Sequence, residues 1–284
     1  MPQKTKIWPR NPALLSGWEF ASNNALARKL SQRGYQAIVE GYTYVDRDSI
    51  LEVFSLVPDA TESLVGVGCD LGSGAGIVSS AIATLDSVTQ IYSLEFVDNC
   101  VELCMPIVFE EISEATSQKI TPILGDFDQL QFDEASLDFC VMWDSLHHAR
   151  DPVATLSGVS RALKQGARLV VVDRAHDNCT KGSVIDAWLN VEYDMEFKRK
   201  NAMPANRTIT RRMNGENEYR ITEIERFFSA AGLRIISGTA VSSDQSLKKN
   251  DADYPELFFL TDLGGFVKKK FIFVLEKMTE PNFE

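Results

Sequence analysis

The chain has 284 residues, of which 44% are hydrophobic, and its formal net charge is −11. A chain of this length can bury a sizeable core and suits one large domain, or one domain with an insertion. The negative charge argues against a broad nucleic-acid footprint, because phosphate binding needs a basic face. No run approaches the roughly 18 apolar residues of a membrane span, so we expect a cytoplasmic protein with no membrane and no nucleic-acid partner.

The five cysteines fit a reducing compartment. Cys69 and Cys140 lie in expected central strands, where a thiol packs as a small hydrophobe. Cys100 and Cys104 lie one turn apart on an expected helix. Two such residues without a second pair are more often packing residues than metal ligands, so we expect no metal site.

Two helices are expected near the N-terminus, over residues 24–33 and 49–56, because their apolar residues recur at helical spacing. Asp48 is the expected N-cap of the second helix. The sequence contains no internal repeat and no low-complexity tract.

Residues 65–78 read Val-Gly-Val-Gly-Cys-Asp-Leu-Gly-Ser-Gly-Ala-Gly-Ile-Val. This pattern predicts a buried strand that runs into a glycine turn and then into a helix. Gly72, Gly74 and Gly76 permit positive φ and allow a ligand to lie on the backbone, where amides of the next helix point at it. The dinucleotide fingerprint G-x-G-x-x-G has a different spacing, so a nicotinamide enzyme is disfavoured.

Four further strands follow in the expected order, and their ranges are 90–97, 119–127, 137–143 and 167–173. The first of them ends near Glu95, which is about 20 residues beyond the glycine turn, where an acidic residue can accept hydrogen bonds from both ribose hydroxyls. Five strands that alternate with helical segments predict an α/β fold with a doubly wound sheet.

Taken in order, these segments resemble the class I S-adenosylmethionine-dependent methyltransferases of the small-molecule type. Asp70 with the three turn glycines resembles the first motif of that family, and residues 143–152 and 163–173 resemble its fourth-strand and fifth-strand signatures. Gln165-Gly166-Ala167 replaces the usual Pro-Gly-Gly turn. The resemblance implies a Rossmann-like seven-stranded sheet with an antiparallel last strand. It also implies S-adenosylmethionine as cofactor and S-adenosylhomocysteine as product.

The resemblance further implies which residues bind the cofactor. These are Asp70, Gly72, Ser73, Gly74, Gly76, Glu95, Phe96, Asp126, Phe127 and Trp143. The turn would hold the amino-acid end, Glu95 the ribose, and Phe96 the adenine, with Asp126 near its exocyclic amine. Trp143 would offer its ring to the sulfonium, and packing in the core is the alternative for this residue.

All three histidines follow expected strand ends, His147 and His148 after the fourth strand and His176 after the fifth. Ligands of an open doubly wound sheet bind at the carboxyl ends of the strands. The three histidines are therefore candidate general bases for methyl transfer, with packing as the alternative for each. Asp144 is a candidate to orient a histidine or to bind an amine acceptor, and surface or capping duty is its alternative.

We expect residues 1–60 to form a helical cap and residues 61–284 the methyltransferase domain, with residues 176–220 as a lid insertion. Leading helices commonly cover the pocket in the family that the chain resembles. Tyr42 and Tyr44 are therefore candidate substrate-binding residues, with half-buried loop positions as the alternative.

Within the insertion, which we define as residues 176–220, apolar spacing predicts a helix over 181–200, and Trp188 is a candidate substrate-binding residue. Basic residues from Lys198 to Arg212 suit an anionic substrate group, or else form a solvated face. Two closing strands are expected over 233–241 and 266–278, as an antiparallel pair at the sheet edge.

These features predict a methyltransferase that acts on a small-molecule acceptor, with a histidine as general base. A methyltransferase that acts on RNA or protein would dock its substrate on the basic residues of the insertion. A non-catalytic S-adenosylmethionine-binding module would need no histidines at the strand ends. The acceptor atom and the oligomeric state stay open.

Overall fold

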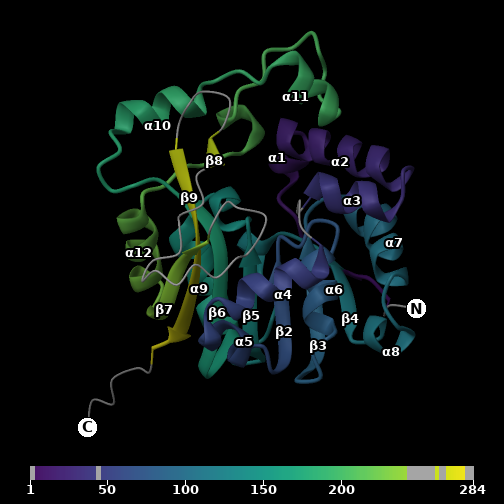
Figure 1. The fold of residues 1–284 in the computed structure, drawn as a ribbon, viewed down its shortest axis with the longest axis vertical. Helices are drawn as coiled ribbons and strands as arrows, with labels where there is room; N and C mark the ends of the chain where they lie inside the picture. Colours follow the sequence, from purple (N-terminus) through teal and green to yellow (C-terminus); the bar gives the residue numbers. More distant parts are fainter. Residues whose placement is uncertain (1–3, 43–45, 242–259, 262–266, 279–284) are drawn as a thin grey trace.

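The computed structural model describes the chain except for residues 1–3, 43–45, 242–259, 262–266 and 279–284. At its centre is a sheet with the strand order β1-β4-β3-β2-β5-β6-β9-β7, and β8 pairs with β9 (Figure 1). The strands are β1 (Lys6–Ile7), β2 (Gly66–Leu71), β3 (Val88–Glu95), β4 (Ile120–Leu124), β5 (Leu137–Trp143), β6 (Leu163–Ala175), β7 (Leu233–Val241), β8 (Leu260–Thr261) and β9 (Val267–Lys277).

The sheet has the predicted Rossmann-like, doubly wound form. Strands β1 to β6 are parallel, and β9 runs antiparallel between β6 and β7. The seven expected strands are thus present, with the last one antiparallel, and β1 and β8 are additions to that plan. The predicted C-terminal pair forms as β7 and β9, with β7 at the edge.

Helices cover both faces of the sheet (Figure 1). The α-helices are α1 (Pro12–Leu15), α2 (Trp18–Ser31), α3 (Tyr35–Tyr42), α4 (Arg47–Ser55), α5 (Pro58–Ser63), α6 (Ile77–Ala83), α7 (Met105–Glu110), α8 (Glu114–Ser117), α9 (Pro152–Ala162), α10 (Gly182–Leu189), α11 (Met195–Lys200) and α12 (Ile221–Ala230). A π-helix, η1 (Cys100–Cys104), and the 3₁₀ helices η2 (Phe127–Gln129), η3 (Leu146–His148) and η4 (Arg212–Asn214) complete the elements. In the part of the chain that the structure describes, no helix has both the length and the apolar content for a membrane crossing.

The core forms on both faces because side chains alternate along each strand. Val170 and Val172 of β6 pack into the cluster that contains α4 and α6. Val171 points the other way, into the cluster that contains α9 and α12. The strands are therefore apolar on both faces, as expected for a mostly parallel sheet between two helical layers.

Two local predictions were wrong. The N-cap of α4 is Asp46, whose carboxylate accepts a hydrogen bond from Ser49 N at 2.9 Å, and Asp48 lies inside the first turn. Residues 181–200 form two helices, α10 and α11, instead of one. The break ends at Asp194, whose side chain accepts a hydrogen bond from Phe197 N at 2.7 Å and caps α11. Aspartate is more favourable at an N-cap than in the interior of a helix.

Helix α2 and the insertion lie together beyond the carboxyl ends of the parallel strands (Figure 1). Lys29 Nζ of α2 donates to the carbonyls of Arg199 and Lys200, both at 3.0 Å. Ser22 Oγ donates to Asn214 Oδ1 at 3.0 Å. The N-terminal helix and the insertion are thus joined directly over the edge of the sheet where ligands bind in this architecture.

Candidate active site

The glycine turn joins β2 to α6 at the switch point, where β3 and β5 flank β2 on opposite sides. Gly72, Gly74 and Gly76 have φ values of 75°, 54° and 79°. A Cβ added to Gly72 would lie 2.7 Å from Ser145 Cβ, and one added to Gly74 would lie 3.3 Å from the ring of Tyr42. Glycine therefore serves both the backbone conformation and the close approach of the neighbouring segments.

Glu95 lies at the end of β3, next to the turn. Its Oε2 accepts a hydrogen bond from Gly74 N at 2.7 Å, and its Oε1 accepts one from Val97 N at 2.9 Å. Burial raises the pKa of Glu95 to about 7, although these amide hydrogen bonds oppose the rise. A carboxylate has about four lone-pair sites, so two donors leave capacity for the hydroxyls of a ribose.

Asp70 lies behind the turn and is not part of the cavity wall. Its Oδ2 accepts from Ser79 Oγ at 2.6 Å, and the hydroxyls of Ser79, Ser93 and Ser73 follow one another at 2.8 and 2.9 Å. Burial raises the pKa of Asp70 to about 7, while the Ser79 hydrogen bond lowers it. Asp70 therefore supports the start of α6 from beneath the turn.

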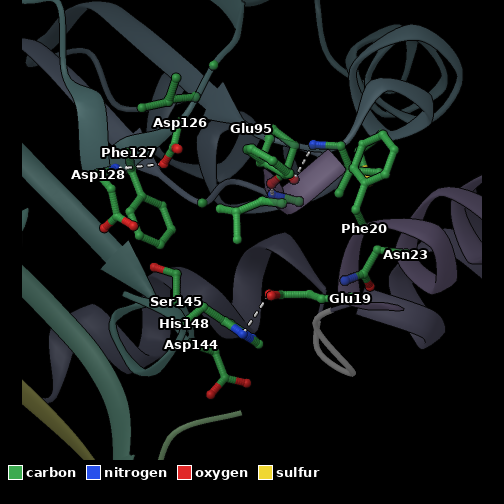
Figure 2. Close-up of a pocket in the computed structure, with 18 of the residues that line it drawn as sticks. Glu19, Phe20, Asn23, Glu95, Asp126, Phe127, Asp128, Asp144, Ser145 and His148 are labelled. Atoms are coloured by element: carbon green, nitrogen blue, oxygen red, sulfur yellow. Dashed lines mark hydrogen bonds and ion pairs between the residues drawn. The ribbon is translucent and has the colours of Figure 1, made fainter. Parts of the chain in front are cut away.

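A cavity lies between the glycine turn, the strand ends and α2 (Figure 2). Its wall brings together many of the residues predicted from the sequence, namely Tyr42, Gly72, Gly74, Glu95, Phe96, Asp126, Phe127, Asp144 and His148. Other predicted residues do not line it: Asp70, Ser73, Gly76, Trp143, His147, His176 and Trp188. Tyr44 lies outside the described residues.

Sequence reasoning missed the contribution of α2 to this wall, which consists of Glu19, Phe20 and Asn23. Figure 2 shows Glu95 and Asp126 on one side of the cavity and Glu19 and His148 on the other. The sequence carries no local signal for this arrangement, because the first turn of an amphipathic helix commonly holds an acidic residue for helix stability alone.

The loop after β4 forms one end of the cavity. Asp126 Oδ1 accepts from Asp128 N at 2.9 Å, and Oδ2 lies 3.3 Å from Arg150 Nη2. Burial raises the pKa of Asp126, and the Asp128 amide hydrogen bond opposes this. Phe127 lies beside Asp126 in the wall, so an aromatic face and a carboxylate are available together (Figure 2).

The segment before α1 crosses the same end of the cavity. Arg10 makes a two-pronged ion pair with Asp98, at 2.9 Å for each contact, and donates to the Phe96 carbonyl at 2.8 Å. Asn11 N donates to Asp126 Oδ2 at 3.4 Å. Arg10 thereby ties the N-terminal segment to Phe96, a residue of the cavity wall.

His147 is buried outside the wall and is fully engaged. Its Nδ1 lies 2.8 Å from Asp173 Oδ1, and its Nε2 lies 2.6 Å from Arg174 Nη2. A guanidinium only donates, so Nε2 accepts from Arg174 and Nδ1 donates to Asp173. Ligand atoms of His147, Asp173 and Asp144 lie within 4.8 Å of one another, but the Arg174 guanidinium already supplies the positive charge there.

His176 and Trp188 belong to a buried cluster of the insertion. His176 Nε2 lies 2.9 Å from Glu218 Oε2, and Trp188 Nε1 donates to Glu218 Oε1 at 2.8 Å. The Arg211 guanidinium lies 3.8 Å from the centre of the Trp188 ring. These contacts hold the insertion together and keep both residues away from the cavity.

His148 is half-buried and lines the cavity. Its Nδ1 lies 2.9 Å from Glu19 Oε1 (Figure 2). The carbonyl of Gly215, in the insertion, lies 3.3 Å from the same nitrogen. Burial lowers the pKa of His148, but the hydrogen bond and the charge of Glu19 outweigh burial and raise the pKa to about 9. Among the three histidines, His148 is therefore the one that faces the predicted site.

Asp144 also lines the cavity, at the end of β5, with a positive φ of 51°. Its Oδ2 lies 3.5 Å from Lys270 Nζ. Burial raises the pKa of Asp144, but the nearby charges of Lys270 and Arg174 outweigh burial and hold the pKa well below its usual range. The neighbouring Trp143 packs edge-on against Phe54, with 5.5 Å between ring centres, and lies outside the wall.

The groups of the cavity fit an adenosyl ligand with a cationic end. Glu95 offers carboxylate acceptors for ribose hydroxyls, and Phe96 and Phe127 offer aromatic faces beside the Asp126 carboxylate. The wall contains no lysine or arginine among the described residues, which suits a sulfonium better than a pyrophosphate.

Comparisons with known proteins agree with this geometry. Residues 69–171 match the family model described as a methyltransferase domain. A protein named O-methyltransferase from Pyrenophora dematioidea is 29% identical over 140 residues, which are 49% of this chain and 49% of that protein. The chain therefore aligns with about half the length of this curated relative.

Similar solved structures show the same fold. One is a putative methyltransferase from Bacillus halodurans, with 15% identity and a TM-score of 0.53, and the match covers 82% of this chain and 99% of that one. Another is the [4+2]-cyclase SpnF, with 16% identity and a TM-score of 0.56, and the match covers 81% of each chain. The names of these two proteins differ in chemistry, so the fold alone leaves the reaction to the site.

Proposed function

Because the chain contains a class I S-adenosylmethionine-dependent methyltransferase domain, whose methyl donor is S-adenosylmethionine, we propose that it methylates a small molecule in the cavity beside α2. The observation that carries this proposal is the composition of one cavity wall. The glycine turn, Glu95 and Asp126 on the cofactor side share that wall with Glu19, Asp144 and His148.

In this proposal the glycine turn and the loop after β4 would hold the two ends of the cofactor. Glu95 would accept from the ribose hydroxyls, and Asp126 would accept from the exocyclic amine of adenine. Phe96 and Phe127 would offer aromatic faces to the adenine ring. When bound, S-adenosylmethionine supplies an electrophilic methyl group on sulfur. The residues of this chain then orient the acceptor for in-line attack, exclude water and receive a proton.

His148 is the proposed proton acceptor. It lines the cavity. Nε2 of His147 instead accepts a hydrogen bond from Arg174, and His176 contacts Glu218 outside the cavity wall. Tyr42 and Asp144 are proposed acceptor-side wall residues, since both line the same cavity.

The contacts of the insertion favour a small acceptor over RNA. Lys198 is buried and donates to Glu192 Oε1 at 2.6 Å and to the Arg207 carbonyl at 2.7 Å. Arg212 pairs with Asp186 at 3.0 Å. These cations are engaged within the chain, which weakens the basic segment as a docking surface, so we propose no nucleic-acid partner.

The organisation and location of the protein belong to the same proposal. Within residues 1–60, we propose that α1 and α2 act as the cap, whereas β1 belongs to the sheet and α4 packs on one sheet face. Residues 61–284 form the methyltransferase domain in this proposal, with the insertion as lid. The hydrogen bonds between α2 and the insertion support a shared cover over the cavity. All five cysteines are free thiols, which supports a cytoplasmic location.

Calorimetric titration of the purified chain tests the cofactor assignment directly. We expect micromolar binding of S-adenosylmethionine and S-adenosylhomocysteine and none of NAD. A panel of phenols, amines and carboxylic acids is then screened for S-adenosylhomocysteine release. Lack of adenosyl-ligand binding, or turnover of RNA or protein alone, would overturn the proposal.

A further inference from the structure

Glu19 and His148 meet inside the cavity although they come from separate parts of the fold (Figure 2). Glu19 lies in the first turn of α2, and His148 ends η3 after β5. The distance from His148 Nδ1 to Glu19 Oε1 is 2.9 Å, and the distance to the Gly215 carbonyl is 3.3 Å. Both neighbours accept hydrogen bonds, so Nδ1 carries a proton.

The neighbouring His147 shows what distinguishes this pair. Its Nδ1 also faces a carboxylate, that of Asp173 at 2.8 Å, but Arg174 occupies its Nε2. No residue in the described part of the chain forms a hydrogen bond with Nε2 of His148. The pair of Glu19 and His148 therefore combines an oriented imidazole with a nitrogen open to a molecule in the cavity.

We propose that Glu19 is a positioning residue for methyl transfer, which holds His148 with its proton on Nδ1 and stabilises the imidazolium formed when Nε2 takes the acceptor proton. This inference rests on the proposed function. In the step, the acceptor's bond to hydrogen breaks and its proton moves to Nε2 of His148. The acceptor atom bonds to the methyl carbon, and the carbon–sulfur bond gives its electron pair to sulfur.

The surrounding charges make Glu19 the decisive neighbour. The charged and titratable groups that act on His148 are Glu19 of α2, Glu216 of the insertion, Arg174 of β6, and the adjacent His147 and Asp144. Burial and Arg174 favour the neutral imidazole, whereas Glu19 and Glu216 favour the imidazolium. Glu19 makes the direct hydrogen bond, so its charge contributes most to stabilising the protonated ring.

The pairing of Glu19 with His148 also gives helix α2 a role in the reaction. Residues 69–171, which match the methyltransferase family, contain His148 but not Glu19. The insertion supplies the second acceptor, the Gly215 carbonyl. The oriented histidine thus forms only when α2, the strand ends and the insertion are assembled.

Glu19→Gln in the full chain tests the proposal without an acceptor. Glutamine keeps the size of the side chain and an acceptor oxygen for Nδ1 but removes the charge. Nuclear magnetic resonance titration of the imidazole signals, assigned with a His148→Gln variant, should show the His148 midpoint at least one pH unit lower in the variant than in the parent chain. Glu40→Gln, at an exposed position of α3, is the matched control and should leave the midpoint unchanged.

Turnover measurements complete the test once the acceptor screen has supplied a substrate. Because Glu19 raises the pKa of His148 to about 9, kcat is compared above this pH, where Nε2 is unprotonated in both proteins. There we expect Glu19→Gln to lower kcat about 10- to 100-fold, to move the acidic limb of the pH–rate profile to lower pH, and to keep the affinity for S-adenosylmethionine within twofold. Glu19→Asp should restore part of kcat.

The outcomes separate this inference from the proposed function. An unchanged His148 midpoint, an unchanged kcat, or a selective loss of cofactor affinity in Glu19→Gln would overturn the positioning role. A shifted midpoint in a chain that binds S-adenosylmethionine but methylates no acceptor would instead overturn the proposed function and leave the ionic pairing established.

Discussion

Replacing Glu95 by glutamine is the sharpest test of the proposed cofactor site. The two carboxylate oxygens accept hydrogen bonds from Gly74 N and Val97 N, at 2.7 and 2.9 Å. Glutamine has nearly the same shape, but its amide nitrogen is a donor and accepts nothing. One of these backbone amides therefore loses its acceptor, and the ribose loses a charged partner.

The size of the effect follows from these contacts. A hydrogen bond to a charged group contributes about 1.5–3 kcal/mol, and the loss of an acceptor for a buried amide costs about 1–3 kcal/mol of stability. Since 1.4 kcal/mol is about tenfold in Kd, we expect Glu95→Gln to weaken S-adenosylmethionine binding about 10- to 150-fold. The measurement belongs at pH 8, because burial raises the pKa of Glu95 to about 7 and the carboxylate is mostly ionised above it.

Isothermal calorimetry with S-adenosylmethionine and S-adenosylhomocysteine gives the affinities, and a thermal unfolding curve shows that the variant is folded. Glu40→Gln, at an exposed position of α3 that does not line the cavity, is the control for the same chemical change. Its Kd should stay within about twofold of the parent chain. Unchanged affinity in Glu95→Gln, or an equal loss in Glu40→Gln, would refute the ribose assignment.

Three other predictions follow from the same site. Burial raises the pKa of Glu95 to about 7, and ribose donors favour its ionised form, so S-adenosylmethionine affinity should rise from pH 6 to pH 8. Binding near pH 7 should therefore release protons, which calorimetry in two buffers of different ionisation enthalpy will measure. An affinity that does not change with pH contradicts this. Gly72 has a φ of 75°, and a Cβ added there would lie 2.7 Å from Ser145 Cβ, whereas Gly166 has a φ of 72° with open space around it. Gly72→Ala should therefore lower Tm more than Gly166→Ala does. Equal losses of Tm would refute the steric argument. Arg10→Ala frees the segment that contacts Phe96 and should raise the S-adenosylmethionine Kd about threefold to fivefold by calorimetry, whereas an unchanged Kd would show that this segment does not support the cofactor site.

The sequence by itself determined the sheet and the side of the cavity that we propose binds the cofactor. The signals there are local: alternating apolar strands, a glycine turn between β2 and α6, and acids at strand ends such as Glu95 and Asp126. In a parallel sheet the strand ends meet at one edge whatever the side chains do elsewhere, so residues read from separate motifs converge on one cavity. The helix starts were less predictable. Asp46 caps α4 and Asp194 caps α11, but several nearby residues could fill the same role.

Only the tertiary structure decided which histidine lines the cavity. In sequence, His147, His148 and His176 are equivalent residues after strand ends, and they differ in the partners that the fold brings to them. Arg174 contacts His147 and Glu218 contacts His176. Glu19, from the distant helix α2, contacts His148 in the cavity wall. Hydrogen bonds between side chains far apart in the chain depend on how whole helices dock, and the residue pattern around each partner carries no record of that docking.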